Sequence, residues 1–197
     1  MAVLVSGSGS NLQALIDSAK EGYFDADIVL VISNNSNAFG LERAKKANIV
    51  SKVVSLSDFE SREIYDKELI KVINEHDIDL VVLAGYMLIC SEAFVDGFYG
   101  RLINLHPSLL PSFAGADGIG DALNYGAKIT GVTVHFVDKG CDTGPVIMQE
   151  AIEIKEGESK ENLAEKIHKI EHKLLPKAVK YFVEGKLKLE GRKVSVF

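Results

Sequence analysis

An asparagine and a histidine two residues apart are the pair of side chains in this sequence best suited to acid–base chemistry. Asn104 and His106 lie at the end of an apolar segment, 102–105, that predicts a short strand. Side chains two apart on a strand project from the same face, and open α/β sheets bind ligands at the carboxyl ends of their strands. Pro107 and Pro111 would hold the following turn rigid. A lone histidine here would usually be structural, but its pairing with an amide favours a place in a binding crevice.

A loop rich in glycine and serine near the start of the chain is suited to holding a phosphate. Residues 6–11 follow an apolar strand at 3–5 and precede helically spaced apolar residues that begin at Leu12. Backbone N–H groups at a helix N-terminus bind a phosphate without needing lysine. Gly7 and Gly9 begin a dinucleotide fingerprint, but Leu12 occupies the place of its third glycine. We therefore expect a single phosphate here, and the alternative is a purely structural turn.

Length, composition and charge exclude several classes of protein. The chain has 197 residues, of which 47% are hydrophobic and 25% charged, as is typical of one globular domain. Its 22 basic and 28 acidic residues give a net charge of −6, which argues against a nucleic-acid partner. No apolar run approaches the roughly 20 residues of a membrane span, and no signal-peptide pattern opens the sequence. We expect a cytoplasmic protein with no membrane partner.

The two cysteines give no sign of a metal centre or a disulfide framework. Cys90 and Cys141 lack C-x-x-C spacing, and two thiols are too few for a zinc site with four cysteine ligands. They are also too few to staple a small secreted scaffold. We expect two reduced thiols and no metal.

The elements that must position these residues alternate between apolar strands and amphipathic helices. Strands are predicted at 3–5, 28–32, 52–54, 80–84 and 102–105, and helices after residue 11 and at 39–47, 64–73 and 91–98. Continuous apolar runs are typical of parallel strands that are covered on both faces. The alternation predicts an α/β fold with a Rossmann-like, doubly wound and mainly parallel sheet.

The second half of the chain changes to an antiparallel pattern. Residues 131–137 and 145–154 alternate with a β period, which predicts a hairpin-like pair joined by 139–144. A helix is expected from 159 to about 182, with Pro176 marking a kink or a break. No linker, repeat or low-complexity tract divides the chain, so we expect one domain.

Five segments, spread through nearly the whole chain, carry a family signature. They read SGSGSNLQALID, SNNSNAFGLERA, VVLAGYM, INLHPSLLP and VDKGCDTGPVI. Together they strongly resemble the phosphoribosylglycinamide formyltransferases, folate-dependent enzymes of purine synthesis. The resemblance implies the formyltransferase fold. It also implies transfer of a formyl group from 10-formyltetrahydrofolate, a co-substrate, to the amino group of glycinamide ribonucleotide.

The resemblance further implies which residues carry the activity. It makes 1–197 a single domain, with a phosphate-binding half at 1–100 and a catalytic and folate-binding half at 101–197. The implied catalytic residues are Asn104, His106 and Asp142. Those implied for the phosphate and ribose of the nucleotide are Gly9, Ser10, Asn11 and Glu171. Those implied for the folate are Arg62, Met87, Leu88, Ile89, Cys90, Asn104, Asp138, Gly140 and Cys141.

The implied catalytic residues suit this chemistry. Formyl transfer to an amine passes through a tetrahedral oxyanion, which needs hydrogen-bond donors and a proton carrier. The Asn104 amide can donate to the oxyanion, and protonated His106 can stabilise it and act as a general acid. Asp142 would favour the protonated imidazole, although alone it could be an acidic turn residue. Neither metal nor covalent intermediate is required, and His135 is expected to be a structural residue.

Two departures from the family pattern and three alternative functions remain. Small residues at 113–120 predict a mobile lid, and Leu88 stands where the family often has arginine. The alternatives are a formyltetrahydrofolate hydrolase-like enzyme, a methionyl-tRNA formyltransferase and a non-catalytic nucleotide-binding module. The two enzymes normally need an additional domain. We expect small-molecule substrates as partners and a monomer or a homodimer.

Overall fold

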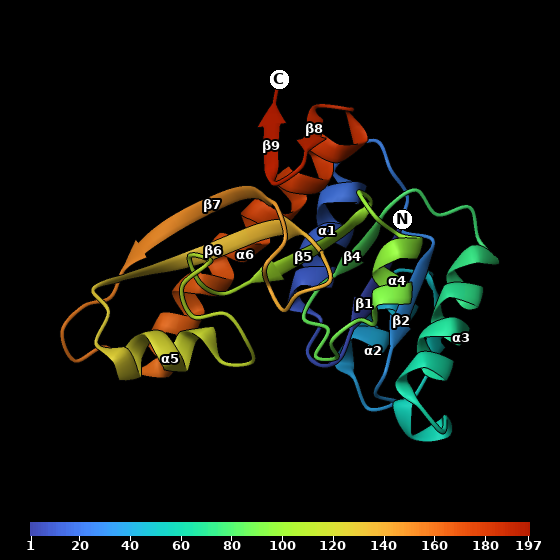
Figure 1. Ribbon diagram of the computed structural model, residues 1–197, viewed down its shortest axis with the longest axis horizontal. Coiled ribbons are helices and arrows are strands. Elements are labelled where there is room, and N and C mark those ends of the chain that lie inside the picture. The colour runs from blue at the N-terminus through green and yellow to red at the C-terminus, as the bar shows by residue number, and fades with distance from the viewer. The chain divides into compact units, whose positions relative to one another are not determined.

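The strands of the computed structural model, which describes residues 1–197, form a seven-stranded sheet and a separate pair (Figure 1). The order in the sheet is β3-β2-β1-β4-β5-β6-β7, and the pair is β8-β9. Contacts divide the chain into two units, Met1–Ile103 and Asn104–Phe197. The boundary falls inside β5 (Leu102–His106), so each unit contains part of that strand.

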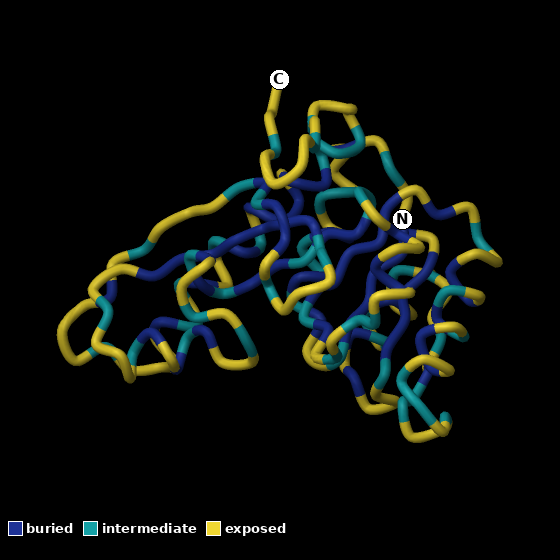
Figure 2. Tube along the Cα trace, viewed as in Figure 1, coloured by how far each residue is buried: buried dark blue, intermediate teal, exposed yellow.

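Four parallel strands form the sheet of the first unit. β1 (Ala2–Val5) pairs with both β2 (Leu30–Ser33) and β4 (Val81–Leu83), and β2 also pairs with β3 (Val50–Val53). Three of them, β1, β2 and β4, are buried along their whole length, and Figure 2 shows the buried chain in dark blue. Burial on both faces explains their continuous apolar sequences, and the predicted mainly parallel sheet is confirmed.

Helices cover both faces of this sheet. α1 contacts α2, and α3 contacts α4. Right-handed crossovers place these two pairs on opposite faces, because the strand order reverses between β1 and β4. Ligands of doubly wound folds bind at the carboxyl ends of the strands where that reversal occurs. The helices and the single 3-10 turn are α1 (Ser10–Lys20), α2 (Phe39–Lys46), η1 (Leu56–Asp58), α3 (Arg62–Asn74) and α4 (Glu92–Gly97).

A long antiparallel hairpin dominates the second unit. β6 (Ile129–Phe136) pairs with β7 (Val146–Glu153), with a β-bulge at Val134/His135, so the predicted hairpin is confirmed. α6 (Lys160–Val183) packs against both strands and runs unbroken through Pro176. The predicted helix is therefore confirmed, and Pro176 does not break it.

Two elements of the second unit differ from the sequence prediction. A short helix that was not predicted, α5 (Gly118–Tyr125), begins at the end of the expected lid segment 113–120, and the Asp117 carboxylate caps it by accepting from the Gly120 N–H (3.1 Å). An unpredicted hairpin of β8 (Leu187–Glu190) and β9 (Lys193–Val196) follows α6. No helix anywhere in the structure combines the length and the apolar character that crossing a membrane requires.

Candidate active site

The turn after β1 is packed tightly against the start of α2. Gly9 precedes α1 with φ of +65°, and a Cβ at this position would lie 2.6 Å from the Cα of Gly40. The Gly40 N–H donates to the Gly7 carbonyl (3.0 Å), and the Arg43 side chain donates to the Ser8 carbonyl (2.9 Å). Only glycine fits this close approach without strain. The loop 7–11 is therefore fixed in shape at the positive end of the α1 dipole, as an anion site requires.

Ser6 ties together the loops that follow three neighbouring strands. Its hydroxyl accepts from the Met87 N–H (2.8 Å) and donates to Asn34 Oδ1 (2.6 Å). Its own N–H donates to the Gly85 carbonyl (3.1 Å). The phosphate loop and the loop after β4 are thus hydrogen-bonded to each other at the carboxyl edge of the sheet. Sequence reasoning placed Ser6 in the loop but gave it no such role.

A buried carboxylate on α3 anchors the loop after β4. Asp66, with its side chain 1% exposed, accepts from the Ser91 N–H (2.7 Å) and lies 3.1 Å from Nη2 of Arg62. The Arg62 guanidinium also lies over the ring of Tyr65, 4.8 Å from its centre. The Tyr65 and Tyr86 hydroxyls are 2.5 Å apart, and burial together with this hydrogen bond raises the pKa of Tyr86. Arg62 is therefore turned onto protein groups instead of solvent.

The residues held by this anchor present an apolar surface. Met87 and Ile89 are each 73% exposed, which is unusual for such side chains. Leu88 and Cys90 are partly buried beside them. Burial and then the Asp66 charge raise the pKa of the Cys90 thiol to about 12, so it is protonated at neutral pH. The loop 87–90 offers backbone groups and apolar side chains, with no charge of its own.

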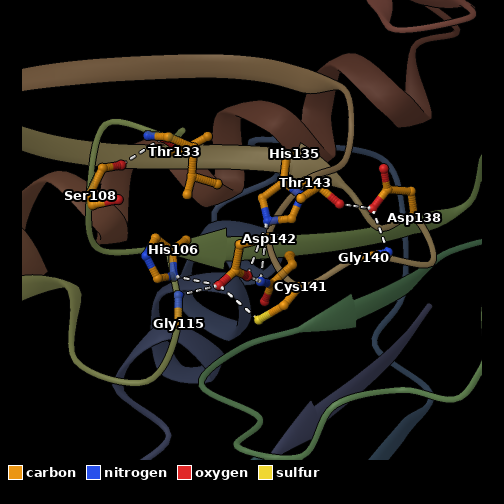
Figure 3. A network of polar contacts seen from close by, with 12 residues as sticks. His106, Ser108, Gly115, Thr133, His135, Asp138, Gly140, Cys141, Asp142 and Thr143 are labelled. Carbon is orange, nitrogen blue, oxygen red and sulfur yellow. Dashed lines mark hydrogen bonds and ion pairs between the residues drawn. The ribbon is translucent and has the colours of Figure 1, made fainter. Parts of the chain in front are cut away.

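In the second unit, β5 ends in a histidine whose two ring nitrogens face different partners. Nε2 of His106 lies 2.8 Å from the Phe113 carbonyl oxygen, and Nδ1 lies 3.4 Å from Oδ2 of Asp142 (Figure 3). A carbonyl only accepts, so Nε2 carries a hydrogen and Nδ1 is the nitrogen that can gain or lose a proton. Asp142 therefore lies beside His106, as the role implied for it requires.

Asp142 stands at the centre of this network. Its carboxylate accepts from the Gly115 N–H (3.0 Å) and from the Asn104 amide (3.2 Å), and Cys141 lies beside it (Figure 3). Burial alone would raise the pKa of Asp142, but the neighbouring His135, the hydrogen bond from the Gly115 N–H and the nearby His106 outweigh it and hold the pKa at about 2. Asp142 is therefore a carboxylate at neutral pH.

A second buried cluster shapes the chain between β5 and α5. The Thr133 hydroxyl donates to the Ser108 carbonyl (2.6 Å) and accepts from the Leu110 N–H (3.1 Å). The Gln149 amide donates to both Thr133 Oγ1 and the Leu110 carbonyl, each at 2.9 Å. The segment that ends in the His106 partner Phe113 is thus held from β6 and β7.

The loop that carries Asp142 is held from within and from the C-terminal hairpin. Asp138 accepts from the Gly140 N–H (3.1 Å) and from the Thr143 hydroxyl (2.6 Å). Arg192, between β8 and β9, donates to the Thr143 carbonyl (2.9 Å). Sequence reasoning did not find Arg192, because nothing in its neighbourhood marks it.

The structure brings only some of the implied site residues together. Asn104, His106 and Asp142 form one cluster in the second unit, and Asp138, Gly140 and Cys141 share the loop of Asp142. Glu171 is buried on α6 in the same unit. The first unit holds the remaining implied residues, which are Gly9, Ser10, Asn11, Arg62 and 87–90.

Comparison with known proteins gives a consistent family. The model of the family described as formyl transferase matches residues 1–179. The phosphoribosylglycinamide formyltransferase of Escherichia coli (strain K12) is 44% identical over 187 residues, which cover 95% of this chain and 88% of that protein. The crystal structure of glycinamide ribonucleotide transformylase 1 from Symbiobacterium toebii superimposes with a TM-score of 0.97 at 41% identity, covering 100% of this chain and 92% of that one.

Some relatives are much longer than this chain. The trifunctional purine biosynthetic protein adenosine-3 of Drosophila melanogaster is 48% identical over 187 residues, or 94% of this chain. The chain spans only 14% of the length of that relative. The similarity therefore concerns one part of the longer protein.

Proposed function

Because the chain belongs to the formyl transferase family, we propose that it transfers a formyl group from 10-formyltetrahydrofolate to the amino group of glycinamide ribonucleotide. The observation that carries the proposal is that the Asp142 carboxylate lies 3.2 Å from the Asn104 amide and 3.4 Å from Nδ1 of His106. This chain matches 88% of the length of the Escherichia coli phosphoribosylglycinamide formyltransferase and 92% of the length of the Bacillus subtilis one.

The reaction needs a balanced movement of one proton. The amine attacks the formyl carbon and a new C–N bond forms, which gives a tetrahedral oxyanion. When the bond from this carbon to the folate nitrogen breaks, that nitrogen takes up one proton and the amine has lost one. A group that carries a proton between two nitrogens and a donor for the oxyanion are therefore required.

His106 is suited to both tasks through one atom. Its Nε2 is occupied by the Phe113 carbonyl, so Nδ1 is the nitrogen left for substrate. In the protonated ring, Nδ1–H donates to the oxyanion and can then pass its proton on. Asp142, ionised and 3.4 Å from Nδ1, stabilises that positive charge.

The remaining implied residues have binding roles in this proposal. The loop of Gly9, Ser10 and Asn11 holds the nucleotide phosphate, because it is rigid and lies at the positive end of a helix. Glu171 binds the ribose. The exposed apolar loop 87–90 and the loop of Asp138, Gly140 and Cys141 bind the folate with Asn104, and Arg62 supports the first of these loops through Asp66.

A product assay with the intact chain tests the proposal. Wild-type protein is mixed with 10-formyltetrahydrofolate and glycinamide ribonucleotide, and both the folate product and the formylated nucleotide are quantified. We expect equal amounts of the two products and, for His106→Ala, a loss of about 100-fold or more in kcat. Folate product without formylated nucleotide would indicate a hydrolase, and binding of the nucleotide without turnover would indicate a non-catalytic module.

A further inference from the structure

The side chain of Arg43, on α2, lies against loop 7–11 and is held there from three sides. Its Nε donates to the Ser8 carbonyl (2.9 Å), and its Nη1 donates to Oε1 of Gln13 on α1 (3.1 Å). The guanidinium carbon lies 4.9 Å from the centre of the Phe39 ring, within the range of a cation–π contact. Gln13 is itself fixed, because its NH2 group donates to Oδ1 of Asp17 (2.8 Å). The guanidinium is therefore held in both position and orientation.

Two consecutive peptides of this loop have their carbonyls bonded to α2. The Gly7 carbonyl accepts from the Gly40 N–H (3.0 Å), and the Ser8 carbonyl accepts from Arg43. In a planar trans peptide the C=O and N–H bonds point in opposite directions. The N–H groups of the same two peptides belong to Ser8 and Gly9, and they therefore point away from α2.

The second of these peptides opens an anion-binding concavity. Gly9 has φ of 65° and ψ of 28°, which is left-handed, and Ser10 is the first residue of the right-handed helix α1. Such a pair of conformations gathers successive backbone N–H groups on one side of the chain, where they can surround an anion. The Gly9 N–H has no acceptor within the chain. The peptide that Arg43 holds by its oxygen thus supplies one N–H group of this concavity.

We propose that Arg43 is a positioning residue for nucleotide binding: by holding the Ser8 carbonyl, it turns the Gly9 N–H toward the phosphate without touching the phosphate itself. This inference rests on the proposed function, in which loop 7–11 binds that phosphate. A hydrogen bond from a charged donor also polarises the peptide, which makes its N–H a stronger donor. Loss of Arg43 therefore weakens binding of the nucleotide and leaves the chemical step unchanged.

Two uncharged substitutions separate the hydrogen bond from the charge of the guanidinium. In Arg43→Gln the amide nitrogen is as many bonds from Cα as Nε is, so it can donate to the Ser8 carbonyl. In Arg43→Met a methyl group takes that place and donates nothing. We expect KM for the nucleotide to rise by about 30-fold in Arg43→Met and by only about 5-fold in Arg43→Gln. KM for the folate and kcat should stay within about 2-fold of wild type in both variants.

Lys46→Met is the matched control for charge. Lys46 lies on the same helix with its Nζ 5.8 Å from the centre of the Phe39 ring, and it makes no hydrogen bond to loop 7–11. We expect the KM for the nucleotide to stay within about 2-fold of wild type in this variant, and thermal melts to show that all three variants are folded. A rise in Lys46→Met equal to that in Arg43→Met would show that only the net charge of α2 matters, and would overturn the inference.

Amide spectra of the protein saturated with glycinamide ribonucleotide report on the Gly9 N–H directly. A new hydrogen bond to phosphate moves an amide proton downfield, and we expect this shift for Gly9 in wild type and Arg43→Gln but a smaller one in Arg43→Met. Equal shifts in the three saturated proteins, or nucleotide binding in Arg43→Gln no tighter than in Arg43→Met, would overturn the inference and leave formyl transfer intact. Failure of the wild-type protein to formylate the nucleotide would overturn the proposed function and this inference with it.

Discussion

The carboxylate of Asp142 approaches His106 at Nδ1 (3.4 Å), while the opposite nitrogen of the ring is held by the Phe113 carbonyl (2.8 Å). The imidazole is thus fixed in position by its non-reacting nitrogen, and its reacting nitrogen faces the carboxylate. Removing the carboxylate and removing the ring should therefore have distinguishable consequences.

Asp142→Asn isolates the charge of the carboxylate. The residue has φ of +53°, a conformation that asparagine tolerates as well as aspartate, so the backbone should not change. We expect kcat to fall by about 100-fold, because the protonated form of His106 loses its stabilising charge. Steady-state kinetics on the variant measure this, with Asp121→Asn on the exposed side of α5 as the control. Wild-type turnover in Asp142→Asn would show that the carboxylate is only a turn residue.

The low pKa of Asp142 also predicts a contribution to stability that depends on pH. A carboxyl group held at about 2 in the folded protein, below its ordinary 3.8, stabilises the fold above about pH 4 and loses this effect as the pH falls toward 2. Allowing for contact with solvent, the contribution at neutral pH is about 1–2 kcal/mol. Urea unfolding of wild type and Asp142→Asn should show a difference at pH 6 that shrinks by roughly half at pH 3. A difference that stays constant over this range would contradict the assignment.

Gly9→Ala should distort the phosphate loop, because its Cβ collides with a neighbouring segment in addition to the strain of a left-handed alanine. The added Cβ meets the Gly40 backbone at 2.6 Å, whereas the same change at Gly22, with φ of +70°, meets nothing within 4 Å. Both variants carry the cost of about 1 kcal/mol for a left-handed residue. Only Gly9→Ala should raise KM for the nucleotide, by about 10-fold, with KM for the folate unchanged. Similar KM values in the two variants would exclude loop 7–11 from nucleotide binding.

Asp66→Asn tests the anchor of the loop after β4. The substitution leaves the partly buried Arg62 without its opposite charge, which we expect to cost about 3 kcal/mol of unfolding free energy. The Ser91 N–H can still donate to the amide oxygen, so the loop should keep its fold but lose rigidity. KM for the folate should rise several-fold with kcat little affected. Asp58→Asn, on an exposed turn nearby, serves as the control, and an unchanged folate KM would rule out the anchor.

Arg192→Ala tests whether the C-terminal hairpin supports the catalytic loop. The variant removes the 2.9 Å hydrogen bond to the Thr143 carbonyl, next to Asp142. We expect kcat to fall by about 5-fold and stability by less than about 1 kcal/mol, since the bond is exposed. The neighbouring Lys193→Ala should have no effect. A thermal melt and a kinetic assay of both variants distinguish loss of positioning from loss of the hairpin.

The sheet of this protein could be predicted from sequence because its signals are local. Buried parallel strands such as β2 are unbroken apolar runs, and the hairpin of β6 and β7 alternates with a period of two. The long helix of the second half was predicted as well, and it continues through Pro176 without the break that a proline can cause. The hairpin of β8 and β9 was missed because its strands are only four residues each, so that their alternation of apolar and polar residues is too short to be distinctive.

The candidate site could be predicted only in part. Asn104 and His106 share a strand, so their convergence follows from backbone geometry. Asp142 came from the resemblance alone, because no local rule folds a loop 38 residues away onto Asn104. The roles of the Phe113 carbonyl, Ser6 and Asp66 depend on hydrogen bonds between distant segments, and periodicity carries no information about these. His135 was expected to be structural, and its contact with Asn104 could be seen only in three dimensions.

The contrast between the two thiols makes the native chain easy to label. Cys90 is shielded and its pKa is raised to about 12, so maleimides and similar reagents should react with it slowly. Cys141 is exposed, although burial and the adjacent Asp142 also raise its pKa, so mildly alkaline buffer should direct a probe to this site first. A fluorophore or spin label attached there would sit one residue from the central carboxylate. Because this loop is proposed to bind the folate, bound folate should slow the labelling of Cys141, which reports occupancy of the loop without any engineered cysteine.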